Sequence, residues 1–344
     1  MTKVRHKIQI SFFIIVLAIL TYLLLKNSGE FFAVLHRISN ADFLYLFIAL
    51  ILQFIYIAPY AQFFQLNYEY IGLKFKLSDM YYSILKMYFF NLIASIGGIG
   101  GTISFMDTGR RQKHSLAKTG VGYIIVSVFN FFIIGIFVFL SAFILSLRHE
   151  LTNYGKLETG LYAIFLTAVL VAFFLAIASP HLLHQLLHKV ADVINNFVEA
   201  LTGKHVINKE SITKKMEHYL DLRDLLKNQY IKHLKITPLL LIAHLIQVFI
   251  VIITFGSIGM QISYIDAFIV YSTVVLVSII SPTPQGAGIV EGSVPLILKP
   301  MGFELSEAIT AIMLYRLVSL WIPVIVGYTM TVVDIRHLFK KKVE

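Results

Sequence analysis

Apolar residues fill most of the chain in long runs, and short polar stretches separate these runs. A membrane-crossing helix needs about 20 apolar residues, because each residue adds about 1.5 Å to its length. The pattern predicts an all-α integral membrane protein with about eight membrane-crossing segments. The predicted crossings are residues 8–25, 43–66, 119–147, 159–179, 238–258, 264–281, a short piece at 285–299, and 306–333.

One further apolar segment, residues 80–106, differs from these runs. A charged loop at 67–80 precedes it, and a basic loop with Arg110 and Arg111 follows it, so both of its ends are expected on one side of the membrane. Its centre is a poor helix interior, because it holds four glycines, Gly97, Gly98, Gly100 and Gly101. We therefore predict a re-entrant hairpin. The alternative is one long helix whose glycines allow close helix packing.

A second interruption lies between 281 and 305, where Pro284, Gly286 and Gly288 break the apolar pattern. Backbone that leaves the helix at membrane depth must be buried in protein or line a wet cavity. Glu291 follows this break and Arg316 lies inside the last apolar run, where single charges are costly unless paired. We predict that these two side chains pair in a lipid-binding or translocation site. The alternative is a structural ion pair that locks two helices.

Composition supports a single polytopic membrane domain over residues 1–344, with 58% hydrophobic and only 14% charged residues. The net charge of +10 is first a topology signal, since the basic residues gather in loops that the positive-inside rule places in the cytoplasm together with both termini. Its second effect is attraction to anionic lipid headgroups, and no nucleic acid is needed to explain it. Run 8–25 follows three basic residues, and we interpret it as a retained helix and not as a cleaved signal peptide.

Residues 181–237 are polar and predict cytoplasmic amphipathic helices. His181, His184 and His188 share one helical face there and could hold a metal, but an interfacial helix is favoured because no carboxylate completes the cluster. The chain has no cysteine, and His244 and Asp266 look isolated. We therefore expect no cofactor, no metal and no catalytic residue.

A weak internal repeat links the two interruptions. Gly98 to Gly100 comes before a long helix that opens near Ser115, and Gly286 to Gly288 comes before another that opens near Ser306. On the predicted topology these two helices run in opposite directions. Inverted repeats with broken helices build the substrate sites of many transporters.

The residues around the second interruption resemble a known family. The run from Pro284 to Glu291, with Gly302, Arg316 and then Trp321, Pro323 and Gly327, is similar to the signature of the lysylphosphatidylglycerol synthase transmembrane region, the flippase-like domain of the multiple peptide resistance factor. The glycine run at 97–101 with Arg110 and Arg111 resembles that family's first glycine/arginine motif. Gln285 and Ala287 replace commoner glycines and are expected to tighten the break.

Full-length members of that family carry a cytosolic domain that transfers lysine from charged tRNA to phosphatidylglycerol, and the resemblance implies a link to antibiotic resistance. The resemblance implies the lipid-translocating half for this chain, in a bacterial-type cytoplasmic membrane. The expected function is to translocate or help expose a polar or aminoacylated phospholipid, with Glu291, Arg316, Pro284, Gly286, Gly288, Gly97, Gly98, Gly100, Arg110 and Arg111 as the candidate site. Arg110 and Arg111 are alternatively topology anchors.

Two other functions stay open. The first is phosphatidylglycerol lysyltransferase activity, although no nucleophile, metal motif or phosphate loop is visible in the sequence. The second is a non-transporting scaffold for a separately encoded synthase or glycosyltransferase, docked on 181–237. The expected partners are therefore an anionic or aminoacylated phospholipid, such an enzyme, or a second copy of the chain.

Overall fold

The structure is a computed structural model that describes residues 36–93, 99–151, 153–178, 231–281 and 283–340. It also describes seven single residues: Val34, Leu182, Gln185, His188, Lys189, Asp192 and Asn195. Every regular element among the described residues is helical, as the sequence predicts. The predicted helix 8–25 and the amphipathic stretch around 201–230 lie outside the described residues.

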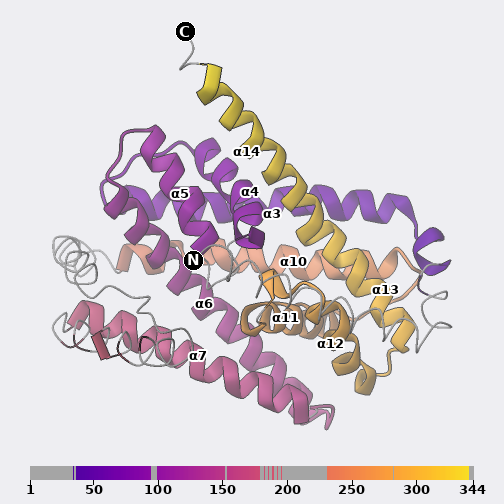
Figure 1. The fold of residues 1–344 in the computed structure, drawn as a ribbon. Helices are drawn as coiled ribbons and strands as arrows, with labels where there is room; N and C mark the ends of the chain where they lie inside the picture. The colour runs from indigo at the N-terminus through magenta and orange to yellow at the C-terminus, as the bar shows by residue number, and fades with distance from the viewer. Residues whose placement is uncertain are drawn as a thin grey trace.

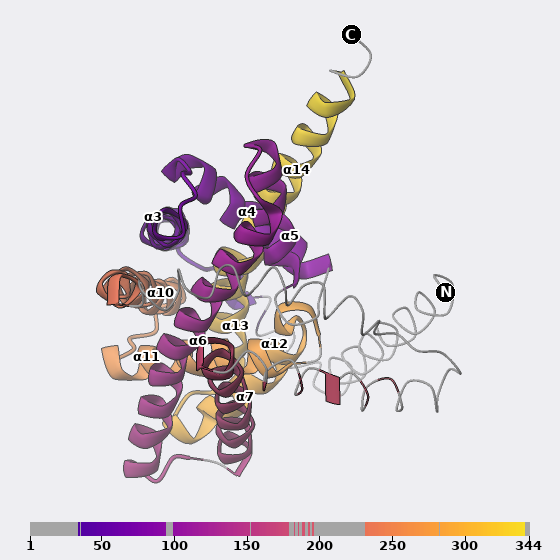
Figure 2. The same cartoon turned by 90° about the vertical axis from the view of Figure 1, so that its left-hand side faces the viewer.

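Two long helices lie side by side along one face of the bundle, α3 (Phe43–Tyr70) and α10 (Pro238–Gly256) (Figure 1). Figure 2 views both nearly end on and shows them still adjacent. They are antiparallel, because the Asp42 backbone N–H donates to the Ser257 carbonyl at one end, while His233 and Asn67 hydrogen-bond at the other. Asp42 also caps the first turn of α3 by accepting from the Leu44 N–H.

Three more helices complete this part of the bundle: α6 (Leu116–Leu147), α7 (Asn153–Ala178) and α11 (Tyr264–Ile280). The Tyr162 hydroxyl on α7 donates to the Phe131 carbonyl on α6, and the apolar side chains of α11 pack against both helices. The structured part of α7 begins well before the predicted residue 159. The first turn of α7 is polar, and a polar turn can be helical as well as an apolar one. Hydropathy alone therefore does not locate the start of this helix.

Four described helices are apolar enough and long enough to cross a membrane: Phe43–Tyr70, Leu116–Leu147, Ile231–Gly256 and Leu305–Asp334. The last of these contains α13 (Leu305–Arg316), a π-helical turn called η3 (Leu317–Trp321), and α14 (Ile322–Lys340). The chain is thus a multi-pass membrane protein. The full number of about eight crossings stays a prediction.

The predicted hairpin segment forms two antiparallel helices, α4 (Leu77–Ile93) and α5 (Ile99–Arg111). The Asp79 carboxylate accepts from the Gln112 amide at the open end, and the Asn91 side chain accepts from the Gly101 N–H near the tip. These contacts exclude the alternative of one continuous helix. The tip itself, with Gly97 and Gly98, lies outside the described residues, and entry and exit on the same side of a membrane stays a prediction.

Cysteine cross-linking tests this hairpin. The hydroxyls of Ser83 and Thr108 are 2.6 Å apart, so the double variant Ser83→Cys/Thr108→Cys should form a disulfide in a chain that has no other cysteine. In one continuous helix these positions would be about 37 Å apart. Mobility on a non-reducing gel after mild oxidation reads out the bond. The control pair Ser83→Cys/Ile103→Cys should stay reduced because Ile103 is exposed on the outside of α5; equal cross-linking of both pairs would contradict the register.

The polar loops collect at two ends of the bundle. Gln112 meets Asp79, and the His114 ring meets the Lys74 carbonyl, so the loops 67–80 and 107–118 share one end. At the other end Arg37 pairs with Glu304 and Glu307. Arg148 pairs with Asp266 there at 2.5 Å, which raises the pKa of the Arg148 guanidinium. The predicted grouping of these loops agrees with the structure, while their orientation in the cell stays a prediction.

Candidate functional site

The predicted break after α11 is present. A short 3₁₀ turn, η1 (Pro284–Gly286), leads to α12 (Ile289–Leu298), and a second, η2 (Lys299–Met301), leads toward α13. Gly286 and Gly288 adopt φ of 71° and 82°, which only glycine reaches without strain. A side chain at Gly286 would also collide with the backbone of Ser278 on α11. The glycines therefore allow α12 to fold back beside α11.

Glu291 and Arg316 form the predicted pair. The Arg316 Nε donates to Glu291 Oε1 at 3.0 Å, and the arginine side chain is only 5% exposed. The other carboxylate oxygen accepts from the Gly288 N–H at 2.8 Å and so caps α12. A second guanidinium nitrogen donates to the Gln285 carbonyl at 2.7 Å. In this conformation the pair satisfies groups of the break itself, and contact with a lipid stays a prediction.

Gln285 connects the break to the hairpin. Its side-chain amide donates to the Tyr88 carbonyl on α4 at 3.1 Å, and its own backbone has a φ of 53°, unusual for a residue other than glycine. The two hydrogen bonds of this residue, one from its side chain and one to its carbonyl, offset the strain of a left-handed backbone. The helix that leads to the first interruption thus contacts the second interruption.

A layer of uncharged polar side chains continues inward from the pair. The Tyr315 hydroxyl donates to Gln247 at 2.9 Å, Gln247 donates to Gln53 at 2.8 Å, and Gln53 donates to the Tyr88 hydroxyl at 3.2 Å. Gln53, Gln247 and Tyr315 are buried. Hydrogen bonds between buried amides and phenols remove most of the cost of placing them among apolar residues. This layer joins α3, α4, α10 and α13.

Four charged side chains form a second group, which we call the ion-pair ring: Lys86, Asp107, Arg111 and Asp334. The Lys86 ammonium lies 3.5 Å from Asp107 and 3.2 Å from Asp334, and Arg111 contacts the same two carboxylates at 2.9 Å and 3.0 Å. Each anion thus touches both cations, and the ring is neutral. It joins α4, α5 and α14 at the end of the bundle that holds the basic loops.

The ion-pair ring borders a cavity of about 440 Å³ between α4, α5 and α14. Its volume is within the range of small-molecule sites, which is about 300–1,000 Å³. The Lys86 side chain is buried, whereas the other three ring members are about one third exposed. The remaining lining is mixed and consists of Asp79, Tyr82, Thr108, Gln112, Thr329, Met330 and Val333.

The ring was not among the predicted site residues except for Arg111. Lys86 carries the same signal as Arg316, a cation inside an apolar run, and that signal could have located it. Its partners Asp107 and Asp334 follow apolar runs, where charges are ordinary. Arg110, the other predicted arginine, is exposed at the end of α5. Gly100 is buried against the α4 backbone, while Gly97 and Gly98 are not described.

Two residues predicted to be isolated have partners. His244 is buried on α10 and hydrogen-bonds to the Tyr271 hydroxyl and to Asn130. Asp266 pairs with Arg148 and shares the N-terminal cap of α11 with Ser263. Among the described residues no group of histidine and acidic side chains is arranged to hold a metal. His181 and His184 lie outside the described residues.

The proposed repeat is only partly matched in its details. Ser115 caps α6 by accepting from the Lys118 N–H. In the second unit the helix begins at Leu305 after Glu304, so Ser306 lies inside the first turn and not at the cap. An inverted relation between the two units stays a prediction.

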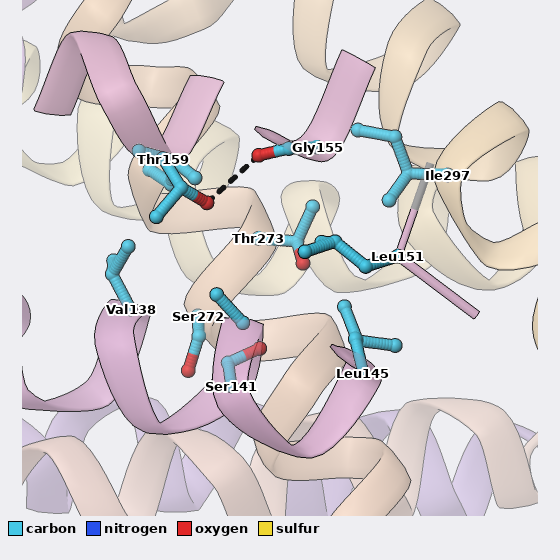
Figure 3. A pocket seen from close by; sticks show the side chains of 11 residues that line it. Val138, Ser141, Leu145, Leu151, Gly155, Thr159, Ser272, Thr273 and Ile297 are labelled. Carbon is cyan, nitrogen blue, oxygen red and sulfur yellow. Dashed lines mark hydrogen bonds between the residues drawn. The ribbon is translucent and has the colours of Figure 1, made fainter. Parts of the chain in front are cut away.

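A second, much smaller pocket lies between α6, α7 and α11 (Figure 3). Val138, Ser141 and Leu145 on α6 face the side chains of Ser272 and Thr273 across it. Its volume of about 20 Å³ has room for roughly one water molecule. It is too small for a lipid headgroup.

The fold and the site define a class, the polytopic α-helical membrane proteins whose broken helices enclose buried charge. Residues 8–327 match the family described as "Lysylphosphatidylglycerol synthase TM region", and the chain belongs to that family. No curated protein matches the chain. The family confirms the resemblance seen in the sequence and relates this membrane protein to lysylphosphatidylglycerol synthesis.

Proposed function

We propose that this protein translocates, or helps to expose, a polar aminoacylated phospholipid such as lysylphosphatidylglycerol across the cytoplasmic membrane. The observation that supports this most directly is the ion-pair ring at the mouth of a cavity of about 440 Å³. Membership of the family adds the lipid class. Under this proposal the α4–α5 hairpin is re-entrant and the cavity opens to the cytoplasm.

The charges of the ring suit such a headgroup. Moving a phosphate and an ammonium into hydrocarbon costs several kcal/mol in lost hydration unless both find partners. Lys86 and Arg111 already hold oxyanions and can exchange a carboxylate for a phosphate. The released Asp107 and Asp334 carboxylates can then accept from the ammonium groups. Each charged group keeps an oppositely charged neighbour during this exchange, with the phosphate shared by Lys86 and Arg111, which keeps its cost low.

The basic loop beside the cavity completes the proposal. Arg110, next in sequence to the cavity-lining Arg111, is exposed and can attract anionic lipids, adding about 1 kcal/mol near a charged surface. Glu291 and Arg316 hold the break in place, and Gln285 of the break hydrogen-bonds to α4 of the hairpin. In this proposal they position the site, and the ring contacts the headgroup.

A vesicle assay tests the proposal. The protein is reconstituted with lysylphosphatidylglycerol in both leaflets, and an impermeant amine-reactive reagent is added outside. The intact protein should make the inner pool reactive over time. Lys86→Met should slow this labelling about tenfold or more, because a hydrogen bond between charged groups contributes roughly 1.5–3 kcal/mol.

Lys156→Met is the matched control. Lys156 is an exposed lysine on α7 and lines neither pocket. It should label at the intact rate. If protein-free vesicles label as fast as those with the intact protein, or if both lysine variants behave alike while folded, lipid translocation through this cavity is wrong.

A further inference from the structure

The last long helix is interrupted at one place. α13 and α14 run as a single rod through the molecule, visible from both directions (Figures 1 and 2), with the π-helical turn η3 between them. A π turn holds one more residue than an α turn, and it frees backbone groups from the regular ladder. Here the Ser319 carbonyl accepts a hydrogen bond from the Gln53 side chain on α3 at 3.4 Å. Such turns are frequent at functional sites and are one of the few causes of helix kinks.

The part of the rod before the turn is held firmly. Arg316, its last α-helical residue, binds both Glu291 and the Gln285 carbonyl and is almost fully buried. The neighbouring Tyr315 donates to Gln247. Three other elements, α12, η1 and α10, therefore hold α13, and none of these contacts lies next to the cavity.

The part after the turn is held differently. α14 lies directly on α4, where Gly327 approaches so closely that a side chain there would meet the Leu85 carbonyl at 2.2 Å. Beyond it Thr329, Met330, Val333 and Asp334 form one wall of the cavity. The ion-pair ring joins the end of this wall to α4 and α5. The other contacts between the described parts of α14 and α4 are apolar or aromatic, such as the ring contact of Tyr328 with Phe89, so the ring is the main polar tie of α14 to the hairpin among the described residues.

We propose that η3 is a hinge and that Asp334 in the ion-pair ring is a latch, so that α14 swings away from α4 and α5 to admit the headgroup. That a lipid headgroup is what enters rests on the proposed function. The motion itself follows from the position of the turn between a buried anchor and a partly hydrated tie. Asp334 is 30% exposed, and Lys86 keeps Asp107 as a partner when Asp334 leaves. Release of the latch therefore leaves no buried charge without a partner.

The expected movement is large enough to measure. From residue 321 to residue 333 the arm is roughly 18 Å long at 1.5 Å per residue. A kink change of about 20° at the turn would move its end by about 6 Å. The chain has no cysteine, so introduced cysteines carry spin labels at chosen sites only.

Pulsed electron spin resonance on the full-length protein in lipid nanodiscs tests the proposal. One label pair, Leu116→Cys/Val333→Cys, reports the end of α14 against α6, and a second, Leu116→Cys/Met313→Cys, reports α13; all three positions are exposed. Asp334→Asn should add a population about 6 Å longer to the first pair and leave the second pair unchanged. Deleting Ser319, which turns η3 into an α turn, should abolish the longer population.

Asp266→Asn is the matched control, since it removes an aspartate from an ion pair at the opposite end, and it should change neither distance. If Asp334→Asn leaves the first pair unchanged, there is no latch. If the distances of both label pairs lengthen together, the hinge is not at η3. This outcome can be seen even if the deletion variant does not fold. The measurement needs no lipid substrate. Its result for the hinge at η3 therefore does not depend on whether the protein translocates lipid.

Discussion

Replacing Arg316 by methionine should destabilise the folded protein by about 3 kcal/mol, because it leaves the largely shielded Glu291 carboxylate, 19% exposed, without its cation. The same change removes the donor to the Gln285 carbonyl, which holds the break against α13. Thermal unfolding in detergent, followed by size-exclusion chromatography, measures the loss. The effect on stability should come before any effect on lipid exposure.

A double-mutant cycle separates the pair from its surroundings. Arg316→Met/Glu291→Gln should recover part of the lost stability, since no charge is then left without a partner. Arg37→Met is the control, because the Arg37 side chain is one third exposed and its two glutamates are at the surface end of the bundle. That change should cost less than about 1 kcal/mol. If Arg316→Met and Arg37→Met cost the same, the pair has no special role in stability. If Arg316→Met and Glu291→Gln stay folded and leave lipid exposure normal, the pair does not position the site.

Replacing Gly100 by alanine should destabilise the hairpin by about 3 kcal/mol. A side chain at this position would lie 2.3 Å from the Phe90 carbonyl on α4, and backbone atoms cannot move aside as a flexible side chain can. The two helices would have to separate, which weakens the hydrogen bond from the Gly101 N–H to Asn91. Because α5 carries Asp107 and Arg111, the ion-pair ring should loosen as well. The readouts are the unfolding temperature and the rate of the Ser83/Thr108 cross-link.

Gly120→Ala on α6 is the matched control for this change. No atom lies within 4 Å of the added side chain there, and alanine is the better helix former by about 1 kcal/mol. Its stability should be unchanged or slightly higher. Equal losses for both alanine variants would mean that helix contact at Gly100 is not what holds the hairpin.

The second interruption was largely predictable, because its signals are strong and few. Proline and glycine mark the break, and an acid and a base inside apolar sequence have few possible partners other than each other. The identity of Glu291 and Arg316 as a pair therefore followed from cost alone. The contacts of Gln285 did not, because they depend on which helix lies beside the break.

The ion-pair ring was harder to predict for a physical reason. Lys86 stands out in its apolar segment, but Asp107 and Arg111 belong to a charged loop and Asp334 ends an apolar helix. Charges at such places normally face water, and only the packing of α14 on the hairpin brings them together around the buried Lys86. Gln53 and Gln247 present the same problem, since single amides in apolar helices give no hint that they meet.

The neutrality of both charged groups determines how membrane voltage can act on this protein. The Glu291–Arg316 pair and the ion-pair ring each carry no net charge, so moving either one as a unit through an electric field requires no electrical work. Transfer of one net charge across the membrane corresponds to about 2.3 kcal/mol per 100 mV. Voltage can therefore act only on the net charge of the cargo and on Asp334, the one ring member that moves apart from the others when α14 swings, so a small voltage dependence should persist when the cargo is electrically neutral.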